Sequence, residues 1–434
     1  MKFALICTTV FVCIATQAYA FSGPVPAAIP SHNFMFGLSN NPESIDWMTS
    51  SGVPWEFRYQ YLTRGWQNWG SDFAYKYMTA SRTNGYFPVF TYYVIFGFGG
   101  EGIDNEYATL NDAAEMNEYF NDFRELMDQC ARYDGPVIVH LEPDMYGYMV
   151  QKSGSSMDAR TVSAAVSASG QADAIASGAP DNFAGFNQVL EYMRDTYAPK
   201  VLLAPMMNHW GTRDPQKAAD FMNSLGVEWD LLFSEWSDRD AEYKNNWFDQ
   251  DDFENVLDYD DVLSENTNLR IMLWQIPCGN MYIDPSNSPE RYKDNRSEYI
   301  FNHVAHMAGH GIIGVLFGRG RDDQTTYGDA GDPEQGYIKC WAGEYYSGTK
   351  GTCSPGSSTL GPVPLPGAGG TVAEIAATAV NRAERHNASG WYSLLGRRIN
   401  PGSIHNRMVG YRIKVVSGRP VVHRIGIAGG ERMK

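Results

Sequence analysis

Two segments of the sequence place carboxylates directly after apolar runs, where a buried strand would end. In residues 137–144 (VIVHLEPD), alternation by two puts His140, Glu142 and Asp144 on one face, and Pro143 cannot extend a central strand. Carboxyl groups this close repel each other, and with burial this raises one pKa toward neutrality. We therefore expect Glu142 or Asp144 to act as a general acid. The alternative is that one of them caps the following helix or pairs with a basic neighbour.

The second segment, residues 231–238 (LLFSEWSD), places Glu235 and Asp238 after an apolar run, with Trp236 between them. A tryptophan ring can stack on the C–H face of a sugar while the acid serves the glycosidic oxygen or the attacking water. The pattern predicts Glu235 as the base or nucleophile and Trp236 as a substrate contact. The alternative places Trp236 in the core and Glu235 in a structural ion pair.

Polar and aromatic side chains near the ends of the other apolar runs are further candidates for substrate contacts. Arg58 and Gln60 alternate with Tyr59 and Tyr61, so either set could face the interior. A single histidine in such a place is more often a structural residue than a base. The full set of expected substrate contacts is Arg58, Gln60, Trp66, Tyr93, His209, Trp236, Trp274, Gln275 and Asp322.

Motifs of other reaction classes are missing from the sequence. It has no GxSxG serine elbow, no phosphate-binding glycine loop before a helix, no HExxH helix and no Cys/His cluster. We therefore expect neither a cofactor nor a metal. A net charge of −16 disfavours nucleic acid as a partner. The acidic run 249–261 lacks the glycine and glutamate of an EF-hand loop, and a solvated loop or helix face is the favoured interpretation.

The elements that must position these residues alternate along the chain. Eight apolar runs have the length of strands, and most are separated by helix-like stretches such as 71–84, 111–133, 182–197, 215–225 and 289–309. This order predicts an α/β fold, a (β/α)8 TIM barrel with its active site at the carboxyl ends of the strands. A doubly wound open sheet is the alternative. The eight runs are 32–40, 55–62, 87–95, 136–144, 201–211, 229–238, 270–277 and 311–319.

The first twenty residues have the pattern of a signal peptide. Lys2 precedes an apolar run, and Ala18-Tyr19-Ala20 forms a small-x-small cleavage site. We expect export to the cell surface or medium of a bacterium, a catalytic domain over 21–353 and no membrane span. Export favours disulfides, and Cys340 with Cys353 is the expected pair, whereas Cys130 and Cys278 either pair or remain buried thiols.

The end of the chain differs in composition from the rest. Residues 354–370 (SPGSSTLGPVPLPGAGG) predict a Pro/Gly linker. From residue 371 the chain carries 11 Lys and Arg against 3 Asp and Glu, a net charge of +8, which leaves −24 on the remainder. Alternating residues in 390–399, 410–419 and 421–427, with a turn at Ser417-Gly418, predict a small antiparallel β domain over 371–434.

The predicted barrel, with acids at its fourth and later strands, resembles the barrels of glycoside hydrolases. In many of these an acid/base lies at strand four, which implies that role for Glu142 or Asp144. Here Leu-Glu-Pro-Asp replaces the usual Asn-Glu-Pro, and Trp274-Gln275 replaces the common strand-seven nucleophile. The tripeptide Glu142-Pro143-Asp144 also resembles a motif of family 6 cellulases. Most of residues 33–340 is similar to secreted bacterial barrel proteins of a glycosidase-like group, on the segments 55–61, 88–93, 137–149 and 292–295.

The tail is similar to the C-terminal sorting domains of the type IX secretion pathway, which implies a contact with secretion machinery. A basic carbohydrate-binding or surface-binding appendage is the alternative.

Together these features predict a secreted, monomeric glycoside hydrolase that cleaves a plant or microbial polysaccharide. Because a strand-seven acid is missing, inversion is favoured over retention. A non-catalytic glycan-binding barrel is the main alternative, since the same aromatic residues would serve it. A polysaccharide lyase is disfavoured because an acidic barrel would repel an anionic substrate.

Overall fold

The computed structural model describes residues 23–29, 31–237, 239–282, 292–318, 325, 335–351 and 356–366, and the backbone of 390–392, 410–416 and 419–425. The chain divides into two compact units, one of which is Phe21–Ala368 and the other of which includes Gly369–Lys434. The larger unit holds all the residues on which the expected chemistry depends.

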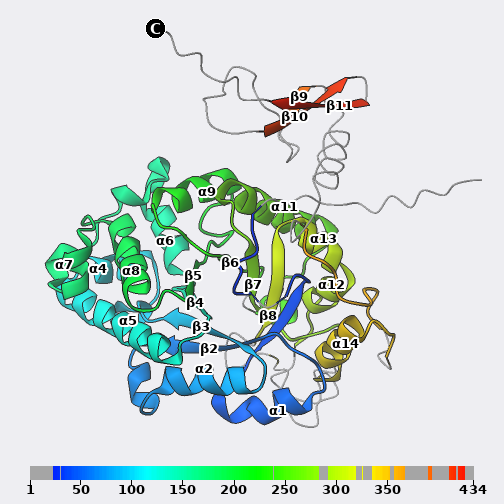
Figure 1. Ribbon diagram of the computed structural model, residues 1–434, viewed down its shortest axis with the longest axis horizontal. Coiled ribbons are helices and arrows are strands. Elements are labelled where there is room, and N and C mark those ends of the chain that lie inside the picture. The colour runs from blue at the N-terminus through cyan, green and yellow to red at the C-terminus, as the bar shows by residue number, and fades with distance from the viewer. Residues whose placement is uncertain are drawn as a thin grey trace, which may run out of the picture. The chain divides into compact units, whose positions relative to one another are not determined.

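Eight parallel strands form the centre of the larger unit (Figure 1). Each apolar run expected to be a strand contains one: β1 (Met35–Ser39), β2 (Phe57–Thr63), β3 (Phe87–Tyr93), β4 (Val137–Leu141), β5 (Val201–Pro205), β6 (Leu232–Ser234), β7 (Ile271–Ile276) and β8 (Ile312–Phe317). Neighbours in sequence are neighbours in space, and β1 pairs with β8. Between β5 and β6, Met206 bridges Phe233 and the Met207 amide donates to the Phe233 carbonyl at 3.1 Å. The sheet is therefore a nearly closed (β/α)8 barrel, in which β5 and β6 meet through this bridge, and the predicted fold class is confirmed.

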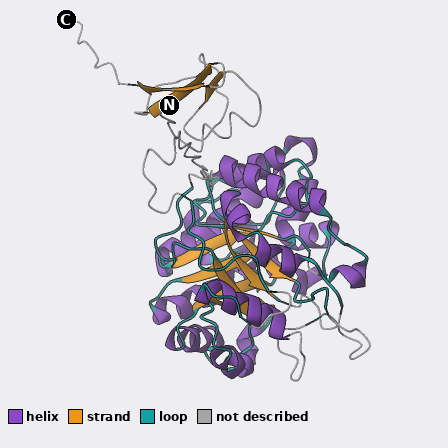
Figure 2. Ribbon diagram, turned by 90° about the vertical axis from the view of Figure 1, so that its right-hand side faces the viewer, coloured by secondary structure: helices purple, strands orange, loops and turns teal. Residues whose placement is uncertain are grey.

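Helices surround the barrel (Figure 2). Several begin at residues whose side chains accept backbone N–H groups of the first turn, as Asp112, Asn182 and Asp214 do for α5, α8 and α9. The acidic run 249–261 forms most of α11, which begins with a capping box of Asp249 and Asp252. The α-helices are α1 (Ile45–Ser50), α2 (Phe73–Thr83), α3 (Phe96–Gly99), α4 (Ile103–Leu110), α5 (Ala113–Tyr133), α6 (Met145–Lys152), α7 (Ala172–Ser177), α8 (Phe183–Tyr197), α9 (Pro215–Ser224), α10 (Ala241–Lys244), α11 (Gln250–Thr267), α12 (Arg296–Asn302), α13 (Val304–Gly309) and α14 (Gln335–Ser347).

Alternation along β2 decides which side chains face the interior of the barrel. Tyr59 lies against Gly318 beyond β8, and the Tyr61 hydroxyl donates to Gln275 across the barrel. Arg58 points the other way and lies over the ring of Tyr77 in α2, 4.1 Å from its centroid. The tyrosines of this strand therefore belong to the interior, and Arg58 and Gln60 belong to its outer face.

The larger unit extends past the expected catalytic-domain boundary at residue 353. The Phe34 amide donates to the Val363 carbonyl at 2.8 Å, and the Leu365 amide donates to His32 at 2.8 Å. Leu365 is also buried in the core. Residues 356–366, part of the stretch expected to be a free linker, are thus packed on the barrel, because Val363 and Leu365 supply apolar anchors that a free linker lacks.

Cys130 and Cys278 are buried and are not disulfide-bonded to each other. Cys353 lies outside the described residues, so its pairing with Cys340 stays a prediction.

In the smaller unit, β10 (Gly410–Val416) pairs antiparallel with β9 (Gly390–Tyr392) and β11 (Arg419–Ile425), which is the β arrangement expected there.

Candidate active site

Asp144 is the accessible carboxylate at the carboxyl end of β4. It stands at the start of α6 and is half-buried, and its Oδ2 accepts the hydroxyl of Tyr93, the last residue of β3. The ring of Tyr93 is fixed against Phe96, with 4.3 Å between ring centroids. Burial raises the pKa of Asp144, and the Tyr93 hydrogen bond partly offsets this by favouring the ionised form.

Glu235 is the second half-buried carboxylate and follows β6 directly. Burial raises its pKa to about 8, and the negative charge of Asp144 adds to this rise. Arg239 is close enough to both acids to lower both pKa values. The charge of Asp144 on Glu235 and that of Arg239 on both acids place these three residues in one electrostatic neighbourhood at the end of the barrel.

Asn208 connects the two acid-bearing segments. It lies after β5, and its amide fits best with nitrogen donating to the Pro143 carbonyl at 3.0 Å and oxygen accepting from Trp210 Nε1 at 2.8 Å. In the other amide orientation its nitrogen is 3.4 Å from Glu235 Oε2. The Asn208 side chain therefore fills the space between the β4 segment and Glu235.

Trp274 and Gln275 lie at an irregularity of β7, where the register with β8 shifts between Leu273 and Ile276. Gln275 adopts a φ of 54°, and it accepts the hydroxyl of Tyr61. Trp274 is buried and donates from Nε1 to Thr91 Oγ1 at 3.0 Å. The irregularity turns two successive side chains toward the interior, which regular alternation would not permit. Asp144 and Glu235 both raise the pKa of Tyr61, so Tyr61 and Gln275 lie next to the acids.

Glu142 does not face the same side as Asp144 and Glu235, contrary to the expectation from alternation. β4 ends at Leu141, and Glu142 has a φ of 39°. Glu142 therefore lies outside the strand, and the alternation of side chains between the two faces of β4 does not extend to it. Its fully buried carboxylate accepts the backbone amides of Val94 at 3.1 Å and Ile95 at 3.2 Å. Its charge also raises the pKa of Tyr119 in α5. Glu142 therefore points toward the helical layer and holds the segment after β3.

His209 and Trp236 are also placed away from the acids. Both contact Asp260 of α11: His209 Nε2 lies 3.3 Å from Oδ1, and Trp236 Nε1 donates to Oδ2 at 3.2 Å. Ser234 Oγ adds a third hydrogen bond to this carboxylate at 2.7 Å. Asp260 is completely buried, so this residue of the acidic run belongs to the protein interior and not to a solvated helix face. His209 and Trp236, both expected to contact substrate, are structural partners of Asp260.

Three expected substrate contacts near β2 also lie away from Asp144 and Glu235. Arg58 is buried on the outer face, where Nε donates to Asn40 at 2.7 Å and Nη1 to Ser81 at 3.2 Å. Trp66, in a short 3-10 turn over Trp66–Trp69, is fully buried. Gln60 is half-buried beside α2. Asp238 and Asp322 lie outside the described residues.

Glu106 of α4 is a buried acid that no sequence pattern indicated. Neither of its carboxylate oxygens has a hydrogen-bond partner within the part of the chain that the structure describes. Burial raises its pKa to about 9, and Glu142 and Asp144 add to the rise. It looks like an ordinary acidic residue of the first helical turn, so only the fold reveals its position behind the two β4 acids.

Nowhere in the described residues do three or more His, Cys, Asp or Glu side chains gather as a metal site requires. None of the described helices has the length and apolar character needed to cross a bilayer.

Neither a protein-family model nor a curated protein sequence matches the chain. Similar solved structures include a modular endo-β-1,4-mannanase of glycoside hydrolase family 26 from Cellulomonas fimi, at 11% identity and a TM-score of 0.44, covering 74% of this chain and 75% of the mannanase. GH26C from Muricauda sp. MAR_2010_75 is 10% identical, with a TM-score of 0.43 and coverage of 71% and 84%. The YdjI aldolase from Escherichia coli K12 is 10% identical, with a TM-score of 0.30 and coverage of 67% and 77%. This likeness concerns the barrel fold alone, and the chemistry is argued from the side chains.

Proposed function

We propose that this protein is a glycoside hydrolase that cleaves a polysaccharide, with Asp144 and Glu235 as its catalytic pair. The observation that carries this is the pair itself: two half-buried carboxyl groups that follow β4 and β6 at the same end of the barrel, each with a raised pKa and each influenced by Arg239. Paired acids at the carboxyl end of a barrel are what glycosidic hydrolysis needs, one to protonate the leaving oxygen and one to assist the water or attack the sugar.

The environment of each acid suggests its role. Glu235, with a pKa of about 8, keeps its proton at neutral pH and is the general acid. Asp144 accepts a hydrogen bond from Tyr93, which favours its ionised form, and is the base or nucleophile. This assignment reverses the one that the sequence favoured. We propose inversion of the anomeric centre, in which Asp144 acts as the base that activates the attacking water.

A polysaccharide is the proposed substrate because aromatic side chains are exposed on the loops that follow the strands. Trp210 is 39% exposed, and its ring centroid lies 4.8 Å from that of Tyr148 in α6. Exposed rings offer stacking surfaces for successive sugar units. The others are Tyr243 in α10 and Tyr282 after β7. We further propose export directed by residues 1–20 and contact with secretion machinery through the tail, on the sequence patterns alone.

The test is release of reducing ends from a panel of neutral polysaccharides. Asp144→Asn and Glu235→Gln are each expected to lower the rate by about 10²–10⁴-fold, because each removes one proton-transfer group. Glu142→Gln is the matched control and is expected to retain most of the activity, since Glu142 faces the helical layer. Thermal unfolding of each variant confirms that it is folded. Binding without release by the wild type would instead favour the glycan-binding barrel.

A further inference from the structure

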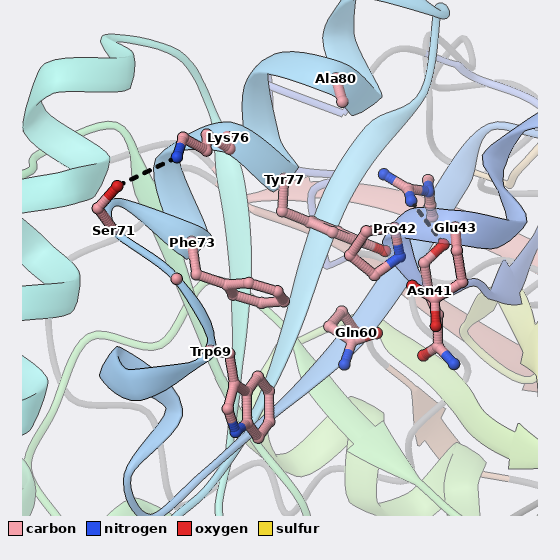
Figure 3. Close-up of a pocket in the computed structure, with 12 residues that line it drawn as sticks. Asn41, Pro42, Glu43, Gln60, Trp69, Ser71, Phe73, Lys76, Tyr77 and Ala80 are labelled. Atoms are coloured by element: carbon pink, nitrogen blue, oxygen red, sulfur yellow. Dashed lines mark hydrogen bonds between the residues drawn. The ribbon is translucent and has the colours of Figure 1, made fainter.

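A cavity of about 640 Å³ lies on the outer face of β2, between the segment that follows β1 and helix α2 (Figure 3). Asn41 and Glu43 line it from the β1 side, and Gln60, Trp69 and Lys76 line it from β2 and α2. Both loops follow the carboxyl ends of their strands, so the cavity opens at the same end of the barrel as Asp144 and Glu235. It is nevertheless a separate site, because Gln60 and Tyr61 are successive residues of one strand and point to opposite faces.

One wall of the cavity is an aromatic surface held in place by its neighbours. Trp69 is 44% exposed, and its ring meets Phe73 edge-on at 87°, with 5.3 Å between centroids. Phe73 in turn stacks on Tyr77, at 6.4 Å and 21°. Leaving this much indole in water costs free energy, whereas Trp66 in the same turn is fully buried. A fixed, exposed ring of this kind suits a ligand with a flat face of C–H groups.

The opposite wall offers hydrogen-bonding groups that the protein does not use. Within the described residues, the side chains of Asn41, Glu43 and Gln60 form no hydrogen bond, and Lys76 Nζ donates only to Ser71, at 3.2 Å. Gln60, Trp69 and Asn41 line the same cavity, and in the view of Figure 3 Gln60 is drawn between the other two. Amide and carboxylate groups beside a ring are the polar complement of sugar hydroxyls.

The charges at this cavity favour a neutral ligand. Glu43 and Lys76 are opposite in sign, and the Arg58 guanidinium is already engaged by Asn40, Ser81 and the Asn41 carbonyl. The exposed charges of the lining, Glu43 and Lys76, therefore balance, and the remaining positive charge belongs to the buried Arg58, whose N–H groups are engaged by the protein. The ring supplies stacking, the amides supply hydrogen bonds, and neither contribution needs a charged partner.

We propose that this cavity is a second, non-catalytic carbohydrate site, which binds a neutral segment of a polysaccharide chain through Trp69 and Gln60. The inference shares with the proposed function only the carbohydrate nature of the ligand. Glu43 is the one acid among the residues that line the cavity, so the site has no acid pair and performs no hydrolysis. Its effect is to keep the protein on a long chain while other segments reach the barrel interior.

The experiment is affinity electrophoresis of the full-length protein in gels that contain soluble galactomannan, arabinoxylan or mixed-linkage β-glucan, with polygalacturonate as the acidic comparison. All variants carry Asp144→Asn, so that the gel polysaccharide is not degraded. Trp69→Ala and Gln60→Ala are added singly. Trp247→Ala, at a tryptophan that is 38% exposed on a different loop, is the matched control. Thermal unfolding verifies that each variant is folded.

The proposal predicts retardation of the Asp144→Asn protein in at least one neutral gel and none in polygalacturonate. Trp69→Ala should weaken the apparent affinity about tenfold or more, Gln60→Ala several-fold, and Trp247→Ala hardly at all. The proposal is overturned if Trp69→Ala is retarded like its parent, if Trp247→Ala loses as much affinity, or if no neutral gel retards the parent. If retardation depends on Trp69 but the wild type never releases reducing ends, the proposed hydrolysis is refuted while the second carbohydrate site is supported.

Discussion

Glu235 holds its proton to higher pH than an ordinary carboxyl group, because burial and the nearby Asp144 raise its pKa to about 8. A general acid must be protonated to work, so kcat/KM should be sustained at neutral pH and fall about tenfold per pH unit above pH 8. The measurement is kcat/KM for an oligosaccharide between pH 5 and pH 10. An activity that rises steadily through pH 9 would mean that Glu235 is not the acid.

The two candidate catalytic residues could be predicted from the sequence, because each follows an apolar run that ends at a barrel opening. Their neighbours could not. Glu142 has the same spacing as Asp144, yet a positive φ turns it toward Val94 and Ile95. Conversely, an irregularity in β7 brings both Trp274 and Gln275 inward. Backbone conformations of this kind depend on contacts between distant segments, and no local pattern encodes them.

The buried Glu106 of helix α4 lowers the free energy of unfolding when its carboxyl group is ionised. Glu106 has a pKa near 9 because burial penalises its charge, so its contribution to stability is full below pH 4.5 and declines as the pH rises toward 9. Replacing it by methionine removes two oxygens that lack partners in the described structure. We expect Glu106→Met to raise the free energy of unfolding by about 1–3 kcal/mol at pH 7, and by more at higher pH.

Urea denaturation at pH 5, 7 and 9 measures this effect. The matched control is Glu125→Met on the exposed side of α5, which should change the free energy of unfolding by less than about 0.5 kcal/mol. A loss of stability in Glu106→Met at all three pH values would show that the carboxyl group has a stabilising partner.

At the scale of elements, the eight strands follow from the apolar runs, because strands buried on both faces are apolar along their length. Helix α11 shows the limit of this argument. Its acidic sequence indicates exposure, and its N-terminus is indeed capped by Asp249, but Asp260 is buried beneath Trp236 and His209. Tertiary hydrogen bonds decide that burial, and composition does not reveal them.

At the scale of the molecule, the boundary of the barrel unit lies after Ala368 rather than at Cys353. Truncation after Ala368 should therefore leave the melting temperature and the activity close to those of the full chain. Truncation after Cys353 removes the pairing of Val363 with Phe34 and the buried Leu365, and it should lower the melting temperature by several degrees. Differential scanning calorimetry of both proteins tests this. Equal stability of the two truncations would contradict it.

The central claim is that water cleaves a glycosidic bond between Asp144 and Glu235, and the most direct test follows the oxygen of that water. The protein is incubated with a neutral polysaccharide in H₂¹⁸O, and the products are analysed by mass spectrometry. The account predicts shortened oligosaccharides carrying one ¹⁸O at the new reducing end, formed by the wild type and by Glu142→Gln but not by Asp144→Asn or Glu235→Gln. Unlabelled, unsaturated products, or labelled products formed equally by all four proteins, would contradict it.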